Sequence, residues 1–111
     1  MFGMTTTSEL LQDGFDRIAE SVHAVLDGLS ADALATQLEP GTNTIAWLVW
    51  HLTRVQDDHV AGAAGAEQVW TAATSGTQSW HERFGLPFDP AALGYGFSAA
   101  DMAQVLSLIH I

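Results

Sequence analysis

The chain has 111 residues, of which 48% are hydrophobic and 14% are charged, with 3 Lys or Arg against 13 Asp or Glu. This composition is apolar enough for one folded domain and too apolar for a disordered acidic tail. The formal net charge of −10 argues against nucleic acid and anionic membranes as partners, because both need clustered basic side chains.

The N-terminal segment, residues 1–7, lacks the basic and apolar regions of a signal peptide. The longest unbroken apolar run, residues 45–50, has only six residues, whereas a helix that crosses a membrane needs about 20. The chain contains no Cys, which excludes disulfides, thiolate metal sites and a Cys nucleophile. We therefore expect a cytoplasmic protein without a membrane partner.

The first predicted helix covers residues 8–28. Its apolar residues follow steps of three and four and form one stripe, which is typical of a bundle helix: Leu11, Phe15, Ile18, Val22, Val25 and Leu29. Thr6 and Glu9 fit a capping box, and Gly28 fits a C-terminal stop. His23 lies off the stripe, so we expect it to be exposed to solvent.

A short helix is predicted from Ser30, as its N-cap, to about Leu38, before Pro40 and Gly41 interrupt the chain. The second long helix is predicted over residues 43–62. Two lines of residues run along it at steps of three and four, about 100° apart around the axis. One line is Ile45, Leu48, Leu52, Val55 and His59, and the other is Trp47, His51, Arg54 and Asp58.

We expect the first line to face the core, with His59 buried and hydrogen-bonded. The second line carries an aromatic ring, an imidazole, a guanidinium and a carboxylate, which suits the lining of a cavity between helices. A structural interpretation stays open, in which Arg54 and Asp58 form a surface ion pair, Trp47 and Trp50 are core aromatics and His51 is a boundary histidine. Asp57 and Asp58 together suggest a solvated face.

The segment over residues 63–97 is rich in Gly and Pro and forms a connection of unusual length, as lids and binding loops do. Short helical turns are predicted at residues 67–71 and 79–84, an extended stretch at 86–90 and a turn at 94–97. We expect the aromatic residues of the connection to attach it to the bundle, namely Trp70, Trp80, Phe84, Phe88, Tyr95 and Phe97.

The last predicted helix begins at Ser98, which fits a second capping box with Asp101. Its apolar side carries Met102, Val105, Leu106 and Ile109. The sequence then ends at Ile111 without a capping signal.

Four segments together resemble the DinB-like superfamily: GTNTIAWLVWHL at residues 41–52, QDDH at 56–59, WHERFGLPF at 80–88 and GYGFS at 94–98. The resemblance extends from about Leu10 to Val105. Within the superfamily the segments are most similar to the actinobacterial mycothiol transferases, which are relatives of mycothiol-dependent maleylpyruvate isomerase.

The resemblance implies an all-α, up-and-down four-helix bundle. It also implies that here the third helix is incomplete and the last helix is missing. We accordingly expect residues 1–106 to form an incomplete bundle domain. The tail at residues 107–111 fits the family poorly and resembles translated adapter DNA, so we expect it to be non-native.

The resemblance further implies a divalent metal ion, zinc or nickel, held by one histidine of the second long helix and two ligands of the last helix. His51 stands at that histidine position. Arg54 could then bind a carboxylate of thiol or substrate, Asp58 could orient His51 or a bound water, and Trp47 and Trp80 could form apolar walls.

The implied function is therefore that of a fragment of a metal-dependent thiol S-transferase, which joins a mycothiol-type thiol to small electrophiles and is inactive as this chain stands. The alternative is a non-catalytic helical module that binds a partner or forms a homodimer.

Overall fold

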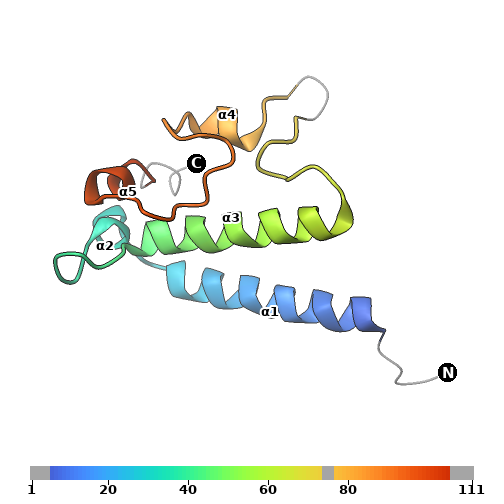
Figure 1. Ribbon diagram of the computed structural model, residues 1–111. Coiled ribbons are helices and arrows are strands. Elements are labelled where there is room, and N and C mark those ends of the chain that lie inside the picture. Colours follow the sequence, from blue (N-terminus) through green and yellow to red (C-terminus); the bar gives the residue numbers. More distant parts are fainter. Residues whose placement is uncertain (1–5, 74–76, 106–111) are drawn as a thin grey trace.

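A computed structural model of the chain describes residues 6–73 and 77–105. Over these residues the fold is all-α, as predicted, with no strand. Five helices follow one another: α1 (Thr7–Leu26), α2 (Ala31–Ala35), α3 (Ile45–Ala64), α4 (Trp80–Phe84) and α5 (Ala99–Val105). Figure 1 shows α1 and α3 running side by side in opposite directions, with the connection and α4 on the other side of α3.

Side-chain caps fix where the helices begin. The hydroxyl groups of Thr6, Ser30 and Thr44 accept hydrogen bonds from backbone N–H groups of the following first turns, at 3.1, 3.1 and 3.0 Å. Each bond satisfies a donor that the helix itself leaves unpaired. The cap at Thr44 explains why α3 begins at Ile45, two residues after the predicted start.

The helix predicted over residues 30–38 ends early, at Ala35. The Gln37 side chain donates to the Thr42 carbonyl at 2.8 Å, and the Thr42 hydroxyl donates to the Glu39 carbonyl at 2.7 Å. These bonds close a compact loop before α3. Pro40 also disfavours a helical conformation at Glu39.

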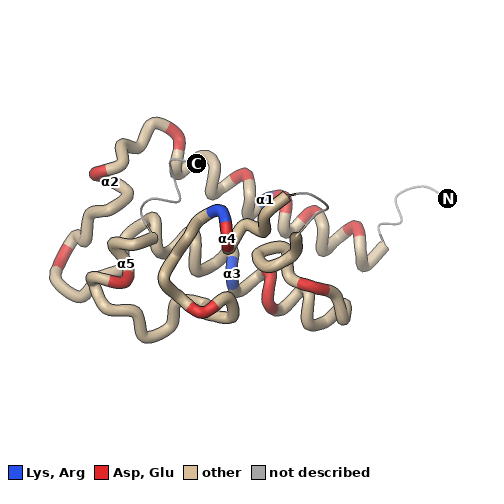
Figure 2. Tube along the Cα trace, turned by 90° about the horizontal axis from the view of Figure 1, so that it is seen from above, with Lys and Arg blue, Asp and Glu red and all other residues tan. Residues whose placement is uncertain are grey.

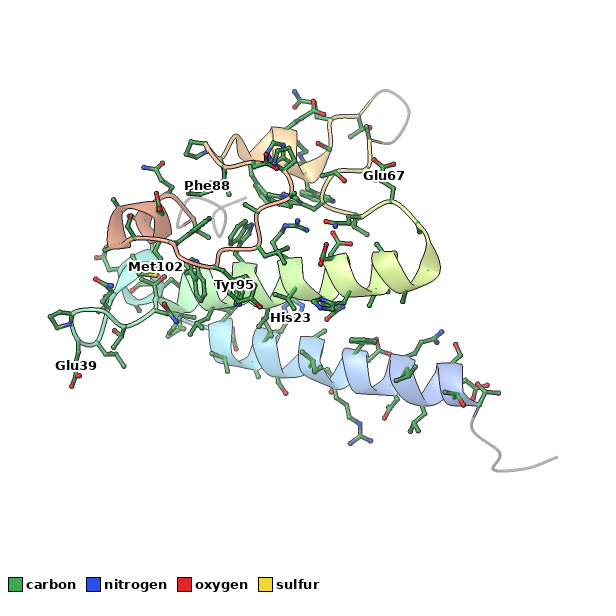
Figure 3. All side chains as sticks on the ribbon, viewed as in Figure 1. His23, Glu39, Glu67, Phe88, Tyr95 and Met102 are labelled. Carbon is green, nitrogen blue, oxygen red and sulfur yellow. The ribbon has the colours of Figure 1, made fainter. Side chains whose placement is uncertain are left out.

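The core lies between α3, the connection and α5. Its buried members are Trp47, Trp50, Trp70, Leu86, Met102 and Val105, with Phe84, Phe88 and Phe97 packed against them. The aromatic residues of the connection therefore attach it to α3, as predicted, although Trp80 and Tyr95 remain 42% and 70% exposed. Figure 3 shows Phe88 on the side of α3 that faces away from α1, and Met102 near the start of α3.

The sequence prediction of the buried face of α3 is wrong in part. Leu48 is 44% exposed, and the His59 side chain is 71% exposed, with its Nδ1 2.7 Å from the Val55 carbonyl of its own helix and 3.9 Å from the Asp58 carboxylate. The buried residues of α3 are Ala46, Trp47, Trp50, Arg54 and Ala61, so the alternative in which Trp47 and Trp50 are core aromatics is confirmed. The physical reason is that the aromatic connection covers more of α3 than α1 does.

α1 packs loosely on α3. None of its residues is fully buried, and a cavity of about 440 Å³ remains between the two helices. Residues of the predicted stripe, among them Ile18, Val22 and Val25, line this cavity opposite Leu48 and Leu52. The stripe thus faces α3 as expected without forming a closed seam.

α5 begins with the predicted capping box. The Asp101 amide donates to the Ser98 hydroxyl at 3.1 Å, and the Ser98 amide donates to the Asp101 carboxylate at 3.0 Å. Met102 and Val105 are buried, as the apolar pattern predicted. The predictions for Leu106, Ile109 and the tail at residues 107–111 lie outside the described residues.

Acidic residues are distributed over the whole molecule, along α1 and around the remaining elements, whereas basic residues are few (Figure 2). Within residues 6–73 and 77–105, none of the helices combines the length and the apolar character that crossing a membrane requires.

Candidate functional site

His51 lies on the edge of α3 that meets the end of the connection, residues 90–95, which we call the strap. Its Nδ1 lies 2.6 Å from the Leu93 carbonyl oxygen. A carbonyl oxygen can only accept a hydrogen bond, so Nδ1 carries the proton and donates it. In the neutral form of the ring this leaves the lone pair on Nε2, the nitrogen that can bind a metal ion.

Two aromatic side chains hold the plane of the His51 ring. Trp47 stacks on it with 4.4 Å between centroids and 14° between planes. Tyr95 meets it edge-on at 4.7 Å, and Figure 3 shows Tyr95 beside the first half of α3. Together with the Leu93 carbonyl, these contacts leave the imidazole partly buried in a defined orientation.

Arg54, one turn further along α3, is only 1% exposed. Its guanidinium donates to the carbonyl groups of Pro90 and Ala92 at 3.2 and 3.3 Å and to the Gln68 side chain at 2.8 Å. It also lies 3.5 Å from the Asp57 carboxylate. Burial lowers the pKa of Arg54 from its ordinary value, and the nearby Asp57 and Asp58 charges partly oppose this effect. The guanidinium thus donates its hydrogen bonds to acceptors within the chain.

The two aspartates next to Arg54 differ in their contacts. Asp57 accepts hydrogen bonds from the backbone amides of Val69 and Trp70 at 2.9 and 2.8 Å, so it is not part of a solvated face as the sequence suggested. Asp58 accepts from the Gln68 side-chain amide at 2.8 Å. Gln68 therefore bridges Arg54 and Asp58 in place of the direct ion pair considered from the sequence, and Leu93 supplies the bond to His51 that was considered for Asp58.

A separate cavity of about 520 Å³ lies along α3. Its aromatic walls are Trp50, Trp70, Trp80 and Phe84, and Arg54 and Asp57 also line it. Successive residues of an α-helix lie 100° apart around its axis, so the α3 residues that line this cavity lie on the side of the helix roughly opposite His51. The structure therefore brings Trp47 to His51 but leaves Trp80 at a different surface.

Sequence reasoning missed three participants, namely Gln68, Leu93 and Gly94. Gly94 has a φ of +106°, and a Cβ atom there would lie 3.0 Å from both Trp47 Nε1 and Trp50 Cζ3. A backbone carbonyl such as that of Leu93 has no signature in the sequence. The predicted turn at residues 94–97, closed by the bond from the Phe97 amide to the Gly94 carbonyl, was the one available signal.

The fit of a metal ion depends on how many ligands converge. Among residues 6–73 and 77–105, no group of three His, Cys, Asp or Glu side chains could hold an ion. His51, with Nδ1 bonded and Nε2 carrying the lone pair, has the form of one metal ligand. The described residues thus fit a single position of a metal site.

An antiparallel pair of long helices with an oriented histidine on one edge is the arrangement from which helical bundles build sites between their helices. The chain belongs to the DinB superfamily, whose family model matches residues 15–110. This superfamily includes metal-dependent enzymes. A comparison with proteins of curated function gives no match.

Proposed function

We propose that the chain belongs to a metal-dependent thiol S-transferase of the mycothiol transferase branch, in which His51 is one ligand of a divalent zinc or nickel ion. The observation that supports this proposal is the 2.6 Å bond from His51 Nδ1 to the Leu93 carbonyl. Metal-bound histidines commonly make such a bond, because it fixes the tautomer that presents the second nitrogen. The remaining ligands would come from water or from residues outside the described part of the chain.

A divalent ion, when bound, supplies a positive charge that lowers the pKa of a thiol and so favours the nucleophilic thiolate. The chain itself contains no Cys, so the reacting sulfur would belong to a small mycothiol-type thiol and the acceptor would be a small electrophile. Trp47 covers one face of His51 and forms the apolar wall of this site.

We assign Arg54 and Asp58 a supporting role. The Arg54 donors are occupied by Pro90, Ala92 and Gln68, and Asp58 is bonded to Gln68, so both residues hold the connection against α3. Trp80 borders the separate cavity and stays outside the His51 site. A cavity of that size suits a small organic molecule with an apolar part.

The test compares two histidines of α3 that both bond a backbone carbonyl through Nδ1. His51 reaches across to Leu93, whereas His59 bonds Val55 of its own helix and is exposed. We expect His51→Ala to lower the Zn²⁺ or Ni²⁺ bound in equilibrium dialysis at least tenfold and His59→Ala to change it less than twofold. Circular dichroism should show the same helical content in both variants. Unchanged metal binding in His51→Ala would contradict the proposal.

One observation favours the alternative function, a helical module that pairs with a partner or with a second copy. The large apolar residues that α1 leaves exposed are Leu10, Leu11, Phe15, Ile18 and Val25. A protein that associates through α1 and binds neither ion in the dialysis experiment would be a module of this kind.

A further inference from the structure

We propose that the strap, residues 90–95, is a positioning device that selects the tautomer of His51, and that Gly94 and Arg54 are its positioning residues. This inference rests on the proposed function only in taking His51 as a metal ligand. The orientation of the ring itself can be measured without a metal ion.

The strap is bonded to α3 at three of its carbonyl groups. Arg54 donates to those of Pro90 and Ala92, and His51 donates to that of Leu93. The two donors lie three residues apart, on one edge of the helix. Arg54 thus fixes the chain immediately before the carbonyl that His51 uses, and a shift of the strap would move that carbonyl away from Nδ1.

Gly94 lets the strap come this close to the helix. Its φ of +106° is one that residues with a side chain rarely adopt, and a Cβ atom there would lie 3.0 Å from Trp47 Nε1 and from Trp50 Cζ3. Both indole rings are buried in the core, so they have little room to give way. A side chain at position 94 would therefore push the strap outward and take the Leu93 carbonyl with it.

Gly96 provides a matched control in the same turn. It also has a positive φ, +76°, but a Cβ atom there meets nothing within 4 Å. Gly94→Ala and Gly96→Ala therefore both place a side chain at a positive φ, and only Gly94→Ala adds a clash with the two tryptophans. A difference in the His51 tautomer between the two variants therefore shows that the close approach of the strap to α3 is needed.

The experiment records imidazole ¹⁵N chemical shifts of the full chain without metal, about two pH units above the ordinary histidine pKa of about 6.5. In the parent protein His51 should be the Nδ1–H tautomer. Gly94→Ala should give a mixture of tautomers, and Gly96→Ala should remain Nδ1–H. When Zn²⁺ is then added, the apparent affinity read from the His51 signal should fall at least tenfold in Gly94→Ala and less than twofold in Gly96→Ala.

The parent protein alone can overturn the inference, even if Gly94→Ala fails to fold, because an Nε2–H tautomer at His51 is incompatible with the Leu93 bond. A folded Gly94→Ala that keeps both the Nδ1–H tautomer and the Zn²⁺ affinity would overturn it as well. The tautomers could respond as expected while Zn²⁺ leaves the His51 signal unchanged. That result would support the positioning role of the strap and contradict the proposal that His51 is a metal ligand.

Discussion

The side chain of Arg54 makes more hydrogen bonds than that of any other residue of α3. It is buried, it bonds two strap carbonyls and the Gln68 amide oxygen, and it lies over the Trp70 ring at 5.5 Å. A guanidinium suits this position because its planar array of N–H groups reaches several acceptors at once, which an ammonium group cannot do.

Replacing Arg54 with Met should therefore destabilise the fold by about 3–5 kcal/mol, because the change leaves Asp57 and the bonded acceptors without their buried partner. Arg17→Met is the matched control, since Arg17 pairs with Asp13 at 2.9 Å on the exposed surface of α1. That change should cost no more than about 1 kcal/mol. Denaturant unfolding measures both, and equal effects would show that the Arg54 network contributes little.

At the scale of the helix, we expect the N-cap of α3 to contribute more to the stability of the fold than the N-cap of α1. Thr44 is buried and its hydroxyl accepts from the Trp47 amide, next to the His51 site. Thr6 makes the corresponding bond at the exposed start of α1. Burial removes the water that would otherwise replace a lost cap.

We expect Thr44→Ala to lower the free energy of unfolding by about 1–2 kcal/mol and Thr6→Ala by about 0.5 kcal/mol. The midpoint of urea unfolding should fall accordingly, with an unchanged slope. A larger effect at Thr6 would mean that α1 and not α3 limits the stability of the fold.

The same helix shows what the sequence could predict. The spacing of apolar residues placed both ends of α1 and α3 within two residues of the observed ends, and it put His51 and Arg54 on one edge. It could not show which edge is buried, because α3 carries apolar residues on both sides and long-range packing of Trp70, Phe88 and Phe97 decides the matter. The partners of His51 and Arg54 are mostly backbone carbonyls, which any residue supplies.

At the scale of the whole molecule, two surface properties oppose each other. α1 exposes a row of large apolar residues, which favours association, since apolar surface of this kind is stabilised by a partner. The net charge of −10, distributed over the molecule as Figure 2 shows, favours separation of the copies. Salt weakens the repulsion and leaves the apolar attraction.

Self-association should therefore increase between about 0.01 M and 0.5 M sodium chloride, as the screening length falls from about 30 Å to below 8 Å. Sedimentation velocity should show species larger than the 11.9 kDa monomer at high salt. Leu11→Gln, on α1, should reduce this association, whereas Val69→Gln, at a residue of similar exposure on the connection, should not. A monomer at every salt concentration would contradict the prediction.

The Arg54 bonds also give this cysteine-free chain a non-covalent counterpart of a cross-link. Gln68 and Pro90 meet at one guanidinium, so the two bonds of Arg54 close a loop between these residues. The entropy of closing such a loop grows only with the logarithm of its length, and doubling the length costs about 0.6 kcal/mol. Insertions in this loop away from its core residues would therefore cost little, whereas the residue that closes the loop has no comparable freedom to vary.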